Sequence, residues 1–342
     1  MTRVLRVDPR APDPTAIAEA SRVLGEGGLV GLPTETVYGL AADAFDPRAI
    51  ARVFAAKGRP ANHPLIAHVS DEAQARTLAG RWSNHAARLA SAFWPGPLTL
   101  VVERARHVPS ALTGGGSSVA VRAPSHAVAR AVIEALGRPV AAPSANRFQG
   151  LSATTAAHVT KSLGDAVDLV LDAGPCEGGI ESTVVDTRGD IVRVLRLGAL
   201  SVCALAALVG HVEASSAVPS PEQGRASPGM DRRHYAPRAR LILSPTRDEA
   251  LRLARSSAEA GVRVAVLARD GGAAAERDAV AGHAPGALLR WLPDDPAAYA
   301  RHLYSALHDL DDAGVSVIVV EDVPAGEPWS AIADRLRRGS AT

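Results

Sequence analysis

Residues 31–68 read GLPTETVYGLAADAFDPRAIARVFAAKGRPANHPLIAH, and this stretch decides the fold that we expect for the chain. Its apolar start predicts a short buried strand. Asp46-Pro47 is typical of a helix N-cap followed by proline in the first turn, and Gly58 ends that helix. The apolar run at residues 65–69 predicts the next strand. We therefore expect a strand, a polar turn, a helix, a basic loop and a second strand.

Polar side chains stand at the breaks between these elements. Thr34, Glu35 and Thr36 put two hydroxyls and a carboxylate at the end of the first strand. The loop that follows the helix displays Lys57, one of only two lysines in an arginine-rich chain. A lysine in this position suggests a need for a compact ammonium, although a solvated charge at a helix end is the alternative interpretation.

The pattern of elements divides the chain into two α/β domains. Helical and strand patterns alternate over residues 1–210, which predicts a twisted mixed sheet with flanking helices. Residues 211–238 are dominated by proline, serine and glycine and are expected to form a linker. Residues 239–342 alternate strand and helix patterns again, which predicts a smaller Rossmann-like domain with parallel strands.

Composition excludes several classes of protein. The chain has 342 residues, 47% of them hydrophobic, and a formal net charge of +1, which argues against a strongly basic nucleic-acid binder. Two cysteines are too few for a disulfide framework or a cysteine-rich zinc site. The N-terminus lacks the apolar core of a signal peptide, and no run of 18 apolar residues occurs, so we expect a cytoplasmic protein.

Several motifs lie beside predicted strands, where α/β sheets bind ligands. Arg122 at a strand end requires an anionic partner, which is either a ligand or a nearby carboxylate. The glycine-rich run at residues 114–118 resembles a phosphate loop but lacks the P-loop pattern, so a flexible turn is equally consistent. Taken alone, residues 143–146 and 181–183 are ordinary turns, and His68 is typical of a core histidine. GxSxG, GxGxxG and HExxH motifs are absent.

Taken together, the motifs resemble a known family. LPTETVYGL, KGRPANHPLIAH, FWPGPLTLV, VAVRAP, APSAN and GGIESTVVD occur in this order across residues 28–196. They resemble the threonylcarbamoyl-AMP synthases of the YrdC/Sua5 family. SPGMDRRHYAP at residues 227–237, followed by a C-terminal α/β domain, resembles the longer, two-domain Sua5 branch.

The resemblance implies a reaction and its partners. L-threonine, bicarbonate and ATP, with Mg²⁺ on the ATP phosphates, would give threonylcarbamoyl-AMP, pyrophosphate and water. This nucleotidyltransferase step would begin the threonylcarbamoyl modification of adenosine 37 in tRNA. Other proteins would transfer the group to the tRNA, so the resemblance implies no strong direct binding of nucleic acid and no membrane partner.

The resemblance also implies roles for individual residues. It gives catalytic roles to Lys57 and Arg59. It implies ATP contacts at Lys57, Arg59, His63, Ser118, Ser144, Asn146, Ser152, Arg196 and Tyr235. It implies threonine contacts at Thr36, His68, Arg122, Ala142 and Ser182, with Arg122 pairing the α-carboxylate. It implies no metal held by protein ligands, and it makes the linker a lid over the ATP site.

Two other classes of function compete with this interpretation. Hydrogenase-maturation carbamoyltransferases contain the same domain, but they also carry zinc-finger cysteines and an acylphosphatase module, for which this chain has no room. A non-catalytic, RNA-binding translation accessory protein is the second alternative. The near-zero net charge and the aromatic content of 4% oppose it.

Overall fold

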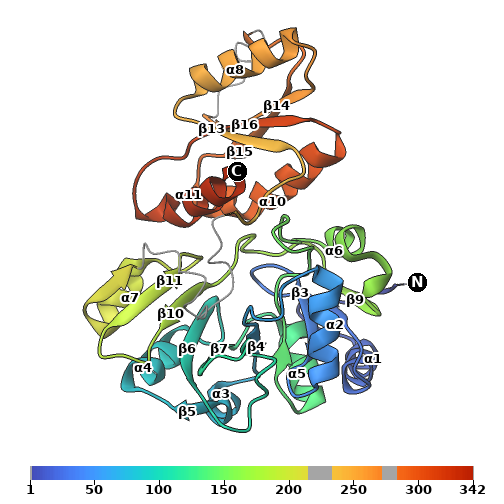
Figure 1. The fold of residues 1–342 in the computed structure, drawn as a ribbon, viewed down its shortest axis with the longest axis vertical. Helices are drawn as coiled ribbons and strands as arrows, with labels where there is room; N and C mark the ends of the chain where they lie inside the picture. Colours follow the sequence, from blue (N-terminus) through green and yellow to red (C-terminus); the bar gives the residue numbers. More distant parts are fainter. Residues whose placement is uncertain (1, 215–232, 272–282, 342) are drawn as a thin grey trace. The chain divides into compact units, whose positions relative to one another are not determined.

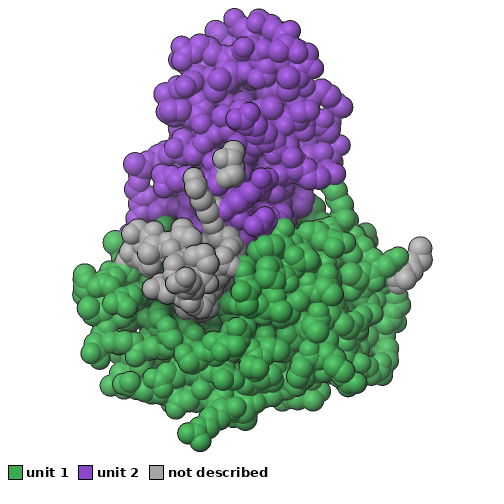
Figure 2. Space-filling model, in the orientation of Figure 1, with its two compact units in different colours: residues 1–148, 152–230 green, residues 149–151, 231–342 purple. Residues whose placement is uncertain are grey.

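A computed structural model describes residues 2–214, 233–271 and 283–341. The chain divides into two compact units, Met1–Phe148 with Ser152–Met230 and Gln149–Leu151 with Asp231–Thr342 (Figure 2). Most of the expected linker, residues 215–232, lies outside the described residues. The expected domain boundaries at residues 210 and 238 stay predictions.

The first unit is built on one large mixed sheet. Its strands are β1 (Arg3–Arg6), β2 (Val30–Leu32), β3 (Gly39–Asp43), β4 (Ile66–His68), β5 (Ala79–Arg81), β6 (Leu98–Arg104), β7 (Ser118–Arg122), β8 (Val140–Ala141), β9 (Leu169–Asp172), β10 (Thr183–Asp186), β11 (Val192–Arg196) and β12 (Val212–Ala214). They follow the order β1-β9-β2-β3-β8-β4-β7-β6-β10-β11-β12, with β5 paired to β6 (Figure 1). The expected mixed α/β fold is confirmed.

Helices cover this sheet, and their ends follow the capping rules. They are α1 (Pro14–Gly25), α2 (Pro47–Lys57), α3 (Glu72–Leu78), α4 (Asn84–Phe93), α5 (Ala127–Leu136), α6 (Ala156–Leu163) and α7 (Val202–Val209), with a 3-10 turn at Gly164–Ala166. The carboxylate of Asp46 caps α2 by accepting a hydrogen bond from the Arg48 backbone N–H. Gly58 ends α2 at φ 63°, a left-handed conformation that glycine adopts without strain.

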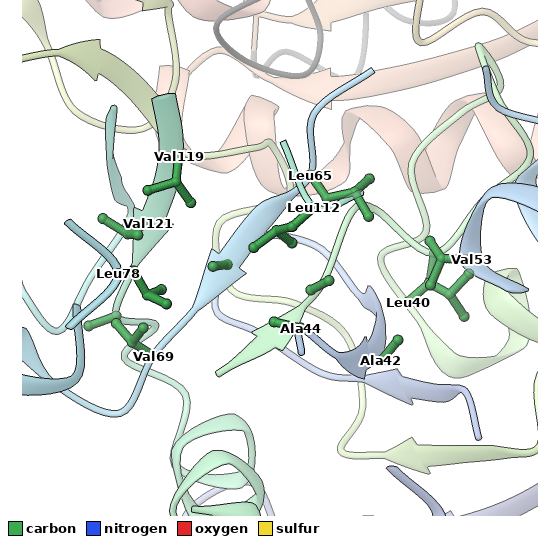
Figure 3. Packing of buried hydrophobic residues seen from close by; sticks show 14 of the residues in the cluster. Leu40, Ala42, Ala44, Val53, Leu65, Val69, Leu78, Leu112, Val119 and Val121 are labelled. Carbon is green, nitrogen blue, oxygen red and sulfur yellow. The ribbon is translucent and has the colours of Figure 1, made fainter. Parts of the chain in front are cut away.

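Both faces of the central strands are buried. Leu40 and Ala42 of β3 belong to one large apolar cluster, which includes Val53 of α2 (Figure 3). Ala41, between them, belongs to a second cluster that α1 and α5 help to form. Because side chains alternate along a strand, β3 needs apolar residues throughout. The sequence predicts a polar turn here, and the structure instead contains a strand.

The second unit contains a small parallel sheet. Its strands are β13 (Arg240–Ser244), β14 (Val264–Asp270), β15 (Leu288–Pro293) and β16 (Val317–Glu321), in the order β13-β16-β14-β15. Helix α8 (Arg247–Glu259) lies on one face of the sheet, and α10 (Pro296–Asp312) and α11 (Glu327–Ser340) lie on the other (Figure 1). The expected parallel arrangement is confirmed. None of the helices in the described ranges is long and apolar enough to cross a membrane.

Candidate active site

The two faces of β7 differ in chemistry. Val119 and Val121 belong to the large apolar cluster, whereas Ala120 belongs to a small separate cluster. Because side chains alternate along a strand, Ser118 and Arg122 lie on the same face as Ala120. Both side chains are buried, with 9% and 3% of the residue exposed. β7 thus carries two buried polar side chains on this second face.

Arg122 is fixed by three different neighbours. Its Nε donates to the Gly96 carbonyl at 3.2 Å, and its NH1 donates to the Thr36 hydroxyl at 2.8 Å. Its NH2 lies 2.7 Å from Oε1 of Glu35. Of the two alternatives for Arg122, the structure contains the nearby carboxylate. Glu35 was noted in the sequence but was given no role.

The turn that carries Glu35 is held by its own hydroxyl groups. Thr34 Oγ1 donates to the Val37 carbonyl at 2.6 Å and lies 2.9 Å from Thr36 Oγ1. From the far side, the Gly178 backbone N–H donates to the Glu35 carbonyl at 2.7 Å. A Cβ on Gly178 would lie 2.9 Å from that carbonyl oxygen, so the close approach requires glycine.

His68 lies next to Arg122 because β4 pairs in parallel with β7 and places the two residues opposite each other. The imidazole is buried, with 3% of the residue exposed. Burial, and after it the charge of Arg122, lowers the pKa of His68 to about 3. Its Nδ1 has no hydrogen-bond partner among the described residues. His68 is therefore a neutral imidazole at neutral pH.

Ser182 directly precedes β10, which pairs in parallel with β6. Its hydroxyl lies 2.7 Å from Thr99 Oγ1, and Thr99 precedes Leu100, which pairs with Val121 on β7. Arg196 NH2 donates to the Ser182 hydroxyl at 3.0 Å and to its carbonyl at 2.9 Å. The structure thus brings an expected ATP contact, Arg196, onto an expected threonine contact, Ser182.

A buried hydroxyl–carboxylate pair involves Glu181, which lies just before β10. Ser152, which has no exposed surface, donates from its hydroxyl to the carboxylate of Glu181. Glu181 is itself buried, with 5% exposed, and it directly precedes Ser182. Taken alone, the sequence indicates a turn at residues 181–183 and no role for Glu181. The glycine pair before it was the only local sign of a tightly packed loop.

Lys57 differs from the exposed loop cation that the sequence suggests. It is the last residue of α2, and only 2% of it is exposed. Its Nζ donates to the backbone carbonyls of Ser144 at 2.5 Å and Asn146 at 2.6 Å. Burial, and after it the charge of Arg59, holds the pKa of Lys57 well below its usual value. The two hydrogen bonds of Nζ fasten the 144–146 loop to the end of α2.

Arg59 and His63 are also turned inward rather than displayed, with 7% and 5% exposed. Both contact the ring of Phe148. The Arg59 guanidinium lies 5.6 Å from the ring centroid, and the His63 ring meets it edge-on at 5.3 Å. Arg59 also donates to the Pro64 carbonyl at 3.2 Å. Arg59 and His63, which are expected to contact the phosphates and the nucleotide, thus pack against the same aromatic ring.

The remaining expected residues of the first unit follow β8. The Ala142 backbone N–H donates to the Ile66 carbonyl at 3.0 Å, and Ser144 forms an isolated bridge with Gly39. The Asn146 side-chain amide donates to the carbonyl of the next residue at 2.7 Å. The loop after β8 is thus tied to both β3 and β4.

Tyr235 belongs to the second unit. It is 2% exposed and adopts φ 60°, a left-handed conformation that is uncommon outside glycine. The Arg335 guanidinium lies 4.8 Å from its ring centroid, and the Tyr304 ring centroid is 6.0 Å away. The part of the expected lid at residues 227–232 lies outside the described residues. The ATP contact of Tyr235 stays a prediction.

Two family models match most of the chain. Residues 22–198 match the family model of the Sua5, YciO and YrdC proteins, described as telomere recombination. Residues 190–341 match the family model described as threonylcarbamoyl-AMP synthase, C-terminal domain.

Individual relatives agree with these matches. Threonylcarbamoyl-AMP synthase of Pyrococcus abyssi is 38% identical over 99% of this chain and 98% of its own length. The Bacillus subtilis protein of the same name is 35% identical over 95% and 92%. The crystal structure of P. abyssi Sua5 complexed with L-threonine superposes with a TM-score of 0.90 at 37% identity, covering 99% of this chain and 98% of that one.

These matches extend over both units and do not support the RNA-binding alternative. Their shared name is that of an enzyme. The chain belongs to the threonylcarbamoyl-AMP synthases, in the two-domain Sua5 branch of the YrdC/Sua5 family.

Proposed function

We propose that this chain condenses L-threonine, bicarbonate and ATP to threonylcarbamoyl-AMP, with release of pyrophosphate and water. The observation that supports this most directly is Arg122, a buried arginine beside Thr36, His68 and Glu35. A fixed guanidinium of this kind suits the α-carboxylate of an amino acid. The chain also aligns over nearly its full length with a relative whose crystal structure holds L-threonine.

In this proposal the threonine pocket is the hydroxyl-rich group around Arg122. Arg122 pairs with the α-carboxylate, and Thr36, His68 and Ser182 surround the rest of the amino acid. The neutral His68 offers Nδ1 for a hydrogen bond without adding a positive charge. Ala142 has no polar side chain, so it contributes shape and backbone groups.

ATP binds, in the same proposal, at the end of the site formed by Lys57 and the loop after β8. An ammonium has three donors, and two of those on Lys57 go to the Ser144 and Asn146 carbonyls, which leaves one for a phosphate. Arg59 adds a second cation. The other residues proposed to contact ATP are His63, Ser118, Ser144, Asn146, Ser152, Arg196 and Tyr235.

The chemistry needs charge neutralisation more than covalent help from the protein. Threonine and bicarbonate first give N-carboxy-threonine and water. A carboxylate oxygen of that product then attacks the α-phosphorus, and the bond to pyrophosphate breaks. Both reactants are anionic, so Lys57 and Arg59 act by positioning them and by stabilising the leaving pyrophosphate.

Mg²⁺ is proposed to arrive with ATP. Within the described residues no three His, Cys, Asp or Glu side chains gather as a metal site. ATP phosphates and water usually coordinate Mg²⁺ in nucleotide sites. The ion would screen phosphate charge, while Lys57 and Arg59 orient the same phosphates.

The product would be passed to other proteins, which attach the threonylcarbamoyl group to adenosine 37 of tRNA. Action in the cytoplasm remains part of this proposal.

The decisive experiment incubates the full-length chain with all three substrates and searches for threonylcarbamoyl-AMP by mass spectrometry. ¹³C-labelled bicarbonate should shift the product by one mass unit. Reactions that lack threonine, bicarbonate or ATP should yield none. ATP turnover that is independent of threonine would contradict the proposal.

A further inference from the structure

The contact between Arg122 and Glu35 is a buried ion pair inside the proposed threonine pocket. The two side chains are 4% and 13% exposed, and their charged atoms approach to 2.7 Å. An ion pair shielded from water in this way loses much of its hydration without becoming a strong source of stability. A pair retained on the ligand-binding face therefore calls for a functional reason.

The pair offers a ligand one group of each sign. The Glu35 carboxylate accepts hydrogen bonds from Arg122 and from the backbone N–H groups of Glu35 and Ser125. Its Oε1 lies 2.7 Å from NH2 of Arg122. A carboxylate and a guanidinium side by side suit a ligand that carries one positive and one negative group.

Among the described residues, the titratable neighbours His68, His126 and Cys176 supply no second cation to Glu35 at neutral pH. Burial, the largest influence, raises the pKa of Glu35, but the charge and hydrogen bond of Arg122 and two backbone hydrogen bonds together outweigh it, so the pKa lies below its ordinary value and the carboxylate is ionised. Burial lowers the pKa of His126 and raises that of the Cys176 thiol, so both are neutral. His68 is neutral as well.

We propose that Glu35 binds the α-ammonium of threonine, so that Arg122 and Glu35 together select a zwitterion. This inference rests on the proposed threonine pocket. When an amino acid binds, its carboxylate forms an ion pair with Arg122 and its ammonium forms an ion pair with Glu35. Two ion pairs then replace one, and every buried charge has a partner of opposite sign. A carboxylic acid that lacks the amine would form an ion pair with Arg122 and leave the Glu35 carboxylate buried without a cationic partner.

This arrangement makes Glu35 a specificity residue that acts in the ground state. The contact is made to the ammonium, whereas the amine that reacts with bicarbonate has lost its proton. Glu35 should therefore govern the affinity for threonine more than the turnover of bound substrate, and its loss should raise KM with little change in kcat.

The test measures binding to the full-length chain by calorimetry, with L-threonine and with 3-hydroxybutyrate, which keeps the carboxylate, hydroxyl and methyl but lacks the amine. Wild type should strongly prefer threonine. Glu35→Gln should weaken threonine binding by roughly 10- to 100-fold, the range expected for a charged hydrogen bond. It should leave 3-hydroxybutyrate unchanged or bound more tightly, because the like charge is gone.

A role of Glu35 in folding alone would weaken both ligands equally, and an unchanged preference in Glu35→Gln would overturn the inference. Glu35→Asp keeps the charge and should restore part of the preference. If Glu35→Gln does not fold, the affinities of the wild-type chain for the two ligands still test the proposal. Equal affinity for threonine and 3-hydroxybutyrate would contradict it. Wild type that binds no threonine would overturn the proposed pocket itself.

Discussion

Burial changes the effect that we expect from replacing Lys57. An exposed cation could be removed with little effect on stability, but the Lys57 ammonium donates to two backbone carbonyls in the protein interior. The residue thus shapes the loop that carries Ser144 and Asn146 before any phosphate arrives. Its removal should affect both the fold and the reaction.

Lys57→Ala is expected to lower the rate of pyrophosphate release by about 10²–10³-fold, as for loss of one donor to developing charge. It should also lower the free energy of unfolding by roughly 1–3 kcal/mol, because buried carbonyls lose their donor. Coupled pyrophosphate assays and urea unfolding measure the two effects. Lys161→Ala, at the other lysine of the chain, is the matched control, and a Lys57→Ala enzyme with full activity would exclude Lys57 from the site.

His68 should make stability depend on pH. Its pKa is about 3 in the folded chain and close to 6.5 in the unfolded chain, so between these values the unfolded state binds more protons. Stability is therefore complete above pH 6.5 and decreases as pH falls, and by pH 5 this group alone accounts for a loss of about 2 kcal/mol.

Urea unfolding at several pH values tests this expectation. His68→Gln should remove that part of the slope, whereas His211→Gln, at an exposed histidine, should retain it. Identical slopes in wild type and His68→Gln would show that the imidazole does not carry the effect.

At the scale of elements, the loop before β10 supports the turn at residues 34–37. Gly178 donates to the Glu35 carbonyl, and an added Cβ would press on that oxygen at 2.9 Å. Gly178→Ala should cost roughly 1–3 kcal/mol of stability, as overpacking does. It should also weaken threonine binding, because Glu35 and Thr36 must move, while ATP binding persists. Gly189→Ala, where the nearest atom is 3.8 Å away, should change neither affinity.

The helices of the first unit were the most predictable elements. Asp46-Pro47 and Gly58 bound α2 as expected, because a cap and a left-handed terminus depend on local chemistry. Short strands were harder to predict. β3 is buried on both sides, so its sequence shows no alternation of apolar and polar residues. β1 and β15 contain exposed residues, so their sequences lack the apolar pattern by which a strand is recognised.

In the candidate site, too, some residues could be predicted from the sequence, whereas their contacts could not. Arg122 and His68 could be singled out from their positions at strand ends, but their contact depends on the parallel register of β4 and β7, which no local pattern specifies. Glu35 could be seen in the sequence as a carboxylate in a turn. Its pairing with a residue 87 positions later needed the folded chain.

At the scale of the whole molecule, one short loop departs from the order of the sequence. Residues 149–151 group with the C-terminal unit, although the residues on either side of them belong to the first. The Ala236 backbone N–H donates to the Gln149 carbonyl at 3.0 Å, and Gly150 forms a parallel bridge with Ala236. This loop directly precedes Ser152, a proposed ATP contact, and we therefore expect its order to depend on the C-terminal unit.

A chain that ends after Ala214 tests the contribution of the C-terminal unit. It should fold cooperatively, because both large apolar clusters of the first unit lie before this point. It should bind threonine normally, since Glu35, Arg122 and Ser182 keep their contacts. ATP binding should weaken at least roughly 10-fold, because residues 149–151 must then be ordered at a cost of about 1–2 kcal/mol each. Calorimetry with each ligand distinguishes the two effects. Equal ATP affinity in the shortened and full-length chains would show that the C-terminal unit does not act through this loop.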